Sequence, residues 1–187
     1  MITGDHMSSA FASRARNASG SLPKLLATSI VAGLAIGVAP TAGATTYTVT
    51  NTNDAGTGSL RAAIAQANSD VTPPTLVLIP SSVSGTITLT SGELGISQAM
   101  SVQGPGASIL SVSGGGSSRV FSVSAGPGKT VSLSGMKIAD GHLSGTHGAG
   151  LNAFGANLAL TDCVFDNNDA SALGGQGGGI YAGDDIY

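Results

Sequence analysis

The chain has 187 residues, of which 29 are glycine, 41% are hydrophobic and only 9% are charged, and its formal net charge is −3. Low charge with abundant glycine is typical of disordered chains, but the hydrophobic fraction is too high for disorder and recurs in regular alternation. No cluster of Lys and Arg is present that could hold a phosphate backbone, so a nucleic-acid partner is not expected.

Residues 1–44 have the three parts of a secretory signal peptide. A basic region (Arg14, Arg16 and Lys24) precedes an uncharged apolar run over residues 25–39, and the small residues Ala42-Gly43-Ala44 follow. This order predicts cleavage after residue 44. The apolar run is shorter than the roughly 20 residues of a membrane span, which favours a cleaved leader over a membrane-spanning helix. The mature part is not expected to cross a membrane. Removal of the leader leaves four basic residues and nine acidic ones, a net charge of −5.

Residues 45–70 are predicted to form a strand and a capping helix. Alternation and β-propensity favour a strand over residues 46–50, and a turn-rich link follows over residues 51–58. Ser59 can cap a short helix that ends at Asn68. Leu60 and Ile64 share one face of that helix, and a helix this short must dock to be stable.

Residues 71–187 contain one structural unit twice. Val131–Gly141 and Leu158–Asn168 superpose at a spacing of 27 positions, with apolar residues matched at 131/158, 133/160, 136/163 and 138/165. Each unit consists of two short alternating strands, one turn residue between them, and a closing corner of Asp, Asn or Gly. One unit cannot bury its own apolar residues, so a repeat of this length predicts a β-solenoid.

A second repeated segment indicates how many strands each coil has. Residues 148–153 reappear 29 positions later as residues 177–182, and Arg119–Val123 is a weaker forerunner. Each coil is therefore expected to carry three strands with glycine corners. The predicted fold class is all-β, a right-handed parallel β-helix with a short N-terminal helical cap. The helix would cover the open end of the solenoid, with Arg61 directed to solvent or to a corner carbonyl and Ala63 at a less critical position.

The repeat assigns roles to individual residues. Cys163 is in register with Met136 and is the sole cysteine, so we expect a small buried hydrophobe and no disulfide. Phe165 is expected in the interior column. Asn168 is expected to adopt the left-handed conformation at its corner or to satisfy corner carbonyls through its amide.

Several motifs that suggest chemistry are better explained as turns. Residues 126–130 (Gly-Pro-Gly-Lys-Thr) precede a predicted strand instead of the helix that a phosphate-binding loop requires, and residues 56–58 lack the third glycine of a dinucleotide fingerprint. The remaining candidates are His142, His147, Asp162, Asp166, Asp184 and Asp185. Asp140 would lie one coil below Asn167, which breaks any column of acids. We therefore predict no catalytic residue, no metal ligand and no cofactor within these residues.

These features resemble a known group of exported proteins. Residues 58–64 (Gly-Ser-Leu-Arg-Ala-Ala-Ile) resemble the N-terminal domain named for its Cys-Ser-Leu-Arg-Glu-Ala signature, with Gly58 in place of Cys and Ala62 in place of Glu. Residues 85–89, 92–96 and 104–106 are similar to the opening coils of the same secreted bacterial β-helix proteins. Residues 178–180 and 165–168 resemble the Gly-Gly-apolar and Phe-x-x-Asn repeats of polymorphic outer-membrane proteins. The resemblance implies a surface-exposed or secreted solenoid, often an adhesin or an autotransporter passenger.

The sequence therefore leads to two functional hypotheses. The first is an exported adhesin-like or structural module at the bacterial surface or outer membrane, with a surface protein, a host protein or a polysaccharide as its partner. The alternative is a carbohydrate-active enzyme of the pectate-lyase-like fold whose catalytic coils lie beyond residue 187. Residue 187 falls in the middle of a predicted coil without a polar capping segment, so we expect a chain that continues.

Overall fold

The computed structural model describes residues 43–72, 74–144, 147–172 and 175–183. The predicted leader lies outside the described residues except for Gly43 and Ala44, and Asp184 and Asp185 also lie outside them. Fifteen strands and one helix are described, and their bounds follow in chain order. They are β1 Thr45–Thr48, α1 Leu60–Ser69, β2 Thr75–Leu78, β3 Gly85–Thr88, β4 Leu94–Ile96, β5 Met100–Gln103, β6 Leu110–Ser113, β7 Phe121–Val123, β8 Thr130–Ser134, β9 Lys137–Ala139, β10 His142–Ser144, β11 Leu151–Phe154, β12 Asn157–Thr161, β13 Val164–Asp166, β14 Asp169–Ala172 and β15 Ile180–Gly183.

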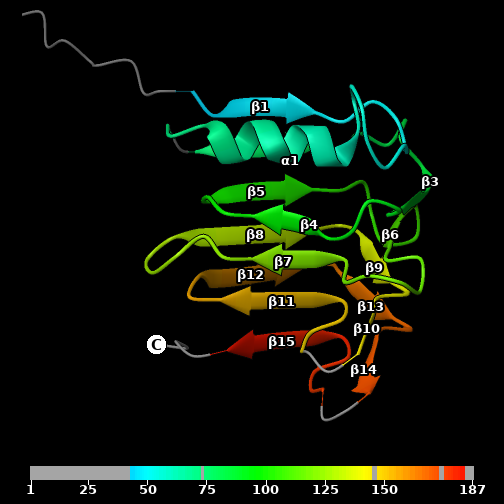
Figure 1. The fold of residues 1–187 in the computed structure, drawn as a ribbon. Helices are drawn as coiled ribbons and strands as arrows, with labels where there is room; N and C mark the ends of the chain where they lie inside the picture. The colour runs from blue at the N-terminus through cyan, green and yellow to red at the C-terminus, as the bar shows by residue number, and fades with distance from the viewer. Residues whose placement is uncertain (1–42, 73, 145–146, 173–174, 184–187) are drawn as a thin grey trace, which may run out of the picture. The chain divides into compact units, whose positions relative to one another are not determined.

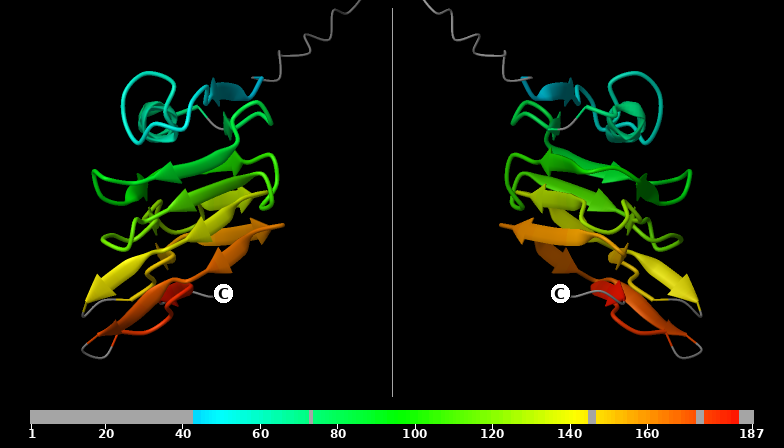
Figure 2. Two further views of the ribbon diagram at one scale, coloured as in Figure 1. Left: turned by 90° about the vertical axis from the view of Figure 1, so that its right-hand side faces the viewer. Right: turned by 90° about the vertical axis from the view of Figure 1, so that its left-hand side faces the viewer.

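The strands form a β-solenoid of about five turns, which confirms the predicted fold class (Figure 1). Sheet A has the order β1-β2-β5-β8-β12, sheet B β13-β9-β6-β3 and sheet C β15-β11-β7-β4, and β10 pairs with β14 in a small fourth sheet. All of the strand pairs are parallel. Each coil thus passes through sheets A, B and C in turn, and the two side views show the coils stacked one on the next (Figure 2).

The predicted registers are confirmed. Leu158 pairs with Val131 and Leu160 with Leu133 in sheet A, and Phe165 pairs with Ile138 in sheet B. In sheet C, residues 151–153 pair with residues 180–182 below and with residues 121–123 above. The alternation places apolar side chains inside the solenoid at every second position, which explains why such short strands are stable only in a stack.

The interior is apolar along its whole described length. Val131, Leu133, Met136 and Ile138 are fully buried. The residues one coil further along (Leu158, Leu160, Cys163 and Phe165) are half-buried and pack against this core. Cys163 thus faces the interior as predicted. It is less covered than expected, because β12 and β13 are edge strands, and no described strand pairs with their outer edges in sheets A and B.

Helix α1 covers the first coil as predicted. The Ser59 side chain accepts a hydrogen bond from the Ala62 N–H at 3.1 Å and so caps the helix. The buried residues Leu60, Ala63, Ile64 and Ala67 recur at the spacing of one helical face. The helix lies against β1, β2 and β4, and Leu60 and Ile64 join the same core as Val77 and Ile79.

Two details of the cap differ from the sequence-based expectation. The helix continues to Ser69, because the Asn68 amide docks onto β4 instead of ending the helix: it donates to the Gly95 carbonyl at 2.8 Å and accepts from the Ser97 N–H at 2.9 Å. Ala63 is only 5% exposed, so it lies in the core and not at a less critical position.

Left-handed backbone also falls one residue earlier than predicted at the Phe-x-x-Asn corner. Asn167 has a φ of 48°, and Asp140, one coil earlier, has a φ of 50°. Asn and Asp tolerate this conformation better than most residues. Asn168 is not among the residues with positive φ, which leaves its side chain in a different role, described below.

Candidate functional site

A polar pocket lies at the corner that follows sheet B. Its volume is about 230 Å³, and it is lined by Gly116, Asp140, Gly141, His142, Asn167 and Asp169. Asp140 follows β9 and Asn167 follows β13, while His142 and Asp169 are register partners at the start of β10 and β14. The solenoid repeat therefore brings together residues that lie 27 positions apart in the sequence.

The Asp140 carboxylate is occupied by bonds between coils. Its Oδ2 accepts from the Ser113 hydroxyl at 2.9 Å, and its Oδ1 accepts from the Asn167 side-chain amide at 2.8 Å. The three side chains form a ladder across three successive coils. The prediction that Asn167 interrupts any column of acids is confirmed.

Asp169 is the second carboxylate of the pocket. Its Oδ1 accepts from the Ser171 N–H at 2.8 Å, and its Oδ2 lies 3.6 Å from His142 Nδ1. Hydrogen bonds from Ser171, with a smaller contribution from His142, lower the pKa of Asp169. A glycosidase needs one carboxyl group whose pKa is raised so that it can act as the general acid, and Asp169 is shifted in the opposite direction.

Asn168 has the structural role that the sequence assigned to its amide. The amide nitrogen donates to the Ile138 carbonyl and the amide oxygen accepts from the Gly141 N–H, both at 2.9 Å. One side chain thus satisfies two backbone groups of the preceding coil, in the manner of the asparagine ladders of stacked strands.

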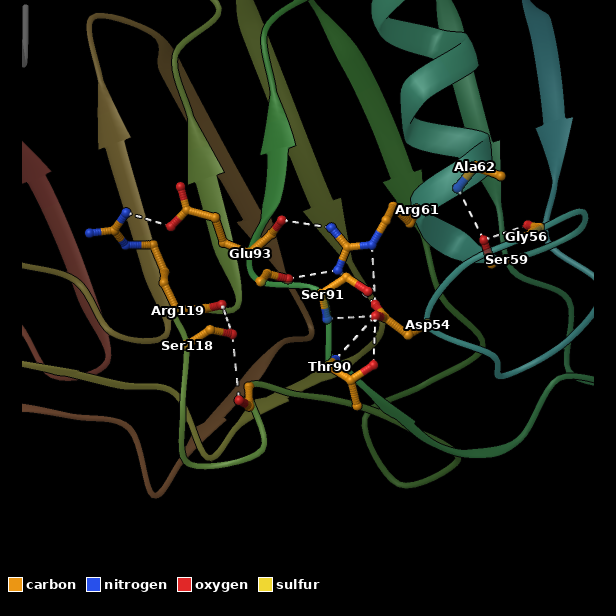
Figure 3. Close-up of polar contacts among 12 residues, drawn as sticks. Asp54, Gly56, Ser59, Arg61, Ala62, Thr90, Ser91, Glu93, Ser118 and Arg119 are labelled. Carbon is orange, nitrogen blue, oxygen red and sulfur yellow. Dashed lines mark hydrogen bonds and ion pairs between the residues drawn. The ribbon is translucent and has the colours of Figure 1, made fainter.

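A second polar network, missed by the sequence analysis, runs along the corner that precedes sheet C (Figure 3). Arg61 on α1 donates to Asp54 Oδ1 from Nη2 at 2.6 Å and from Nε at 3.1 Å. It also donates to the carbonyls of Gly92 at 2.6 Å and Glu93 at 2.9 Å. The expectation that Arg61 meets a corner carbonyl is confirmed.

Asp54 joins the helix cap to the first corner. Its Oδ2 accepts from the backbone N–H groups of Thr90 at 3.1 Å and Ser91 at 2.8 Å, and from the Thr90 hydroxyl at 3.0 Å. Burial by itself raises the pKa of Asp54, but hydrogen bonds from Ser91, Arg61 and Thr90 outweigh it and hold the pKa far below its usual value. The folded protein therefore favours the charged carboxylate.

Arg119 extends the network to the later coils. It donates to Glu93 Oε2 at 2.7 Å and to the carbonyls of His147 and Gly148, each at 2.9 Å. The His147 ring in turn accepts at Nδ1 from the Gln176 N–H at 3.0 Å and stacks on Tyr181 with ring centroids 4.5 Å apart. Arg119 itself could have indicated this network, because it is one of few charged residues and it lies at the start of a repeated segment.

The other predicted site residues do not converge. His142 and His147 belong to different networks, and Asp162 and Asp166 are exposed, with Asp166 paired to Lys137 at 3.3 Å. Burial raises the pKa of the Cys163 thiol, which disfavours the reactive thiolate. Residues 126–129 form a turn before strand β8, which begins at Thr130, and residues 56–58 form a turn before α1, as predicted.

Within the described part of the chain, no group of three or more His, Cys, Asp or Glu residues is placed to hold a metal ion. Over the same residues, no helix has the length and apolar character needed to cross a membrane. No protein-family model, curated protein or solved structure matches the chain.

Proposed function

We propose that the protein is an exported β-helix module that acts at the bacterial surface or in secreted form, in the manner of an adhesin or an autotransporter passenger. The observation that carries the proposal is the use of the charged side chains. Asp54, Arg61, Arg119 and Asp140 all bind backbone or side chains of a neighbouring coil. Charges used in this way hold a scaffold together and are not free to converge on a substrate.

The outer faces of the coils support the same interpretation. The outward positions of sheet A in the middle coils are Ser101, Gln103, Ser132 and Ser134, which alternate with buried residues. An uncharged face rich in hydroxyl groups suits contact with a surface protein or a polysaccharide. The apparent secretory leader and the resemblance to polymorphic outer-membrane repeats are consistent with exposure of this face outside the cell.

Export and adhesion are tested together on the full chain produced in a Gram-negative host. We expect the protein in the medium or at the surface, with an N-terminus that begins Thr45-Thr46-Tyr47 on sequencing. Beads coated with the exported protein should adhere to bacterial or host-cell surfaces more than uncoated beads. Retention of the uncleaved chain in the cytoplasm would contradict export, and adhesion equal to that of uncoated beads would contradict an adhesive role.

The alternative function, a pectate-lyase-like enzyme, gains some support from the pocket that brings His142 close to Asp169 at a distance of 3.6 Å. The same exported protein distinguishes the two functions when it is incubated with polysaccharides. The release of reducing ends or unsaturated products, abolished by Asp169→Asn, would favour the enzyme over the adhesin.

A further inference from the structure

Sheet C lies on the side turned to the viewer in Figure 1. Its outer face carries aromatic side chains. Phe154 is 59% exposed and occupies an outward position at the end of β11. Tyr181 is outward on β15, where it pairs with Asn152, and its ring stacks on His147 with an interplanar angle of 22°. The described surface thus gathers one Phe and one Tyr ring beside a His ring, in a protein in which only 4% of residues are Phe, Trp or Tyr.

Gly183 lies beneath two of these rings. It is the register partner of Phe154. A Cβ atom at this position would lie 2.8 Å from Tyr181 Cε1 and 3.2 Å from Phe154 Cδ2. The two rings therefore lie close over the backbone of Gly183, and any larger residue at this position would have to displace the Tyr181 ring.

Polar groups adjoin the rings on the same face. Ser122, Asn152 and Tyr181 form one outward column across β7, β11 and β15, and Ser124 lies exposed beside it. The Asn152 Oδ1 atom is buried without a hydrogen-bond partner. A buried acceptor without a donor is rare, and a ligand hydroxyl could supply the donor only after the groups that cover Asn152 have moved.

The charge of the face decides the class of ligand. None of the outward residues at 95, 122, 124, 152, 154, 181 and 183 is charged. Glu93 and Arg119 at its edge neutralise each other at 2.7 Å. A polyuronate or another polyanion would find no cation here. Exposed aromatic rings beside hydroxyl and amide groups suit a ligand with apolar C–H faces and many hydroxyl groups.

We propose that this face binds a neutral glycan, with the Phe154 and Tyr181 rings stacked on sugar rings and the serine and asparagine side chains bonded to sugar hydroxyls. The proposal names the partner of the adhesive module and rests on that proposed function. The glycan would lie across the strands, whose spacing of about 4.8 Å is close to the length of one sugar ring.

The test is affinity electrophoresis of the purified protein, taken from whichever cell fraction contains it, in native gels that contain hydroxyethylcellulose, xylan, galactomannan or, as the anionic probe, polygalacturonate. We expect retardation in at least one neutral gel and none in polygalacturonate. Phe154→Ala should raise the dissociation constant roughly five- to tenfold, the size of one aromatic contact. Gly183→Ala should also weaken binding, because the new methyl group would push the Tyr181 ring out of its place.

Val71→Ala is the matched control, since Val71 is an apolar residue that is 82% exposed and lies outside sheet C. It should bind as the unchanged protein does, and thermal unfolding should show that Phe154→Ala remains folded. The proposal is overturned if no neutral gel retards the protein, if polygalacturonate retards it more, or if Phe154→Ala and Gly183→Ala both bind like the unchanged protein. Because the gels report binding whether or not the chain was exported, failure here leaves the export result standing.

Discussion

Two corners of the solenoid join their coils by different means. At the corner before sheet C, the guanidinium groups of Arg61 and Arg119 each reach across to two backbone carbonyls of another coil. At the corner after sheet B, short side chains join the coils. Asp140 forms hydrogen bonds with Ser113 and Asn167, and the Asn168 amide forms hydrogen bonds with backbone groups.

The difference reflects what each corner has to connect. Arg61 lies on α1 and must span from a helix to a strand end, which a long, multiply donating side chain can do. The corner after sheet B repeats at 27 residues, so identical positions are one strand spacing apart and a short amide is sufficient. The Arg61 link stabilises the joint between the helix and the first corner, and the Arg119 link joins corresponding corners of two coils. The short links stabilise the 27-residue repeat.

Helix α1, which carries Arg61 and caps the first coil, is the element whose loss should have the largest effect on stability. Ile64→Asp would place an unpaired carboxylate at a position that is only 2% exposed. We expect a loss of several kcal/mol in the free energy of unfolding, with aggregation because the first coil would be uncovered. Urea unfolding and light scattering measure both. The matched control is Ala65→Ser at an exposed position of the same helix, and an Ile64→Asp variant that stays soluble, monomeric and equally stable would show that α1 is dispensable.

Arg61→Ala tests the long link directly. It would leave the Asp54 carboxylate, whose side chain is 9% exposed, without its cation and would remove the donors to the Gly92 and Glu93 carbonyls. We expect the free energy of unfolding to fall by about 2 to 3 kcal/mol. Arg61→Lys keeps the charge but not the forked geometry, so it should recover only part of the loss. Equal stability of the Lys variant and the unchanged protein would mean that charge alone matters.

The contrast between the corners also explains what could be predicted from sequence. The register of Val131 with Leu158 and of Ile138 with Phe165 was predictable, because period-2 alternation and a fixed repeat leave one way to bury those residues. The Asp140 and Asn167 contact was predictable for the same reason. The amide of Asn168 was assigned correctly, while the left-handed residue was placed one position too late.

The Arg corner was not predictable beyond Arg61 itself. Asp54 lies in an irregular turn, and its partners Thr90 and Ser91 lie more than 35 residues away outside the repeat. No periodicity connects such residues. The aromatic group was missed for a related reason, because Phe154 and Tyr181 are outward residues, and burial patterns report only the inward ones.

The pH dependence of stability should distinguish the two corners. Because the pKa of Asp54 is lowered on folding, the unfolded chain takes up a proton at a higher pH than the folded chain does. The stabilisation is therefore complete above the unfolded value near 3.9 and is lost as the pH falls toward the folded pKa. Asp54→Asn removes this titration, so we expect a variant that is less stable at neutral pH and loses less stability between about pH 5 and pH 3.

Urea unfolding at several pH values within that interval measures the slope. Asp70 and Asp169, whose pKa values are also lowered, titrate in the same direction and should account for the slope that remains in the variant. If the free energy of unfolding of Asp54→Asn depended on pH as steeply as that of the unchanged protein, the acid sensitivity would come from those two residues and not from the Arg61 corner.

Asn168→Ala tests the short link and should have the smallest effect of the four. The substitution leaves the Ile138 carbonyl and the Gly141 N–H without partners in a half-buried setting, which should lower the free energy of unfolding by about 1 to 2 kcal/mol. The control is Asn167→Gly at the neighbouring position, where the backbone has a φ of 48° and the side chain is exposed. Glycine relieves the left-handed backbone, and water can replace the lost bond to Asp140, so the change should stay within about 0.5 kcal/mol. If Asn167→Gly proved the more damaging variant in urea unfolding, the Asp140 ladder, and not the amide of Asn168, would be the main tie between these coils.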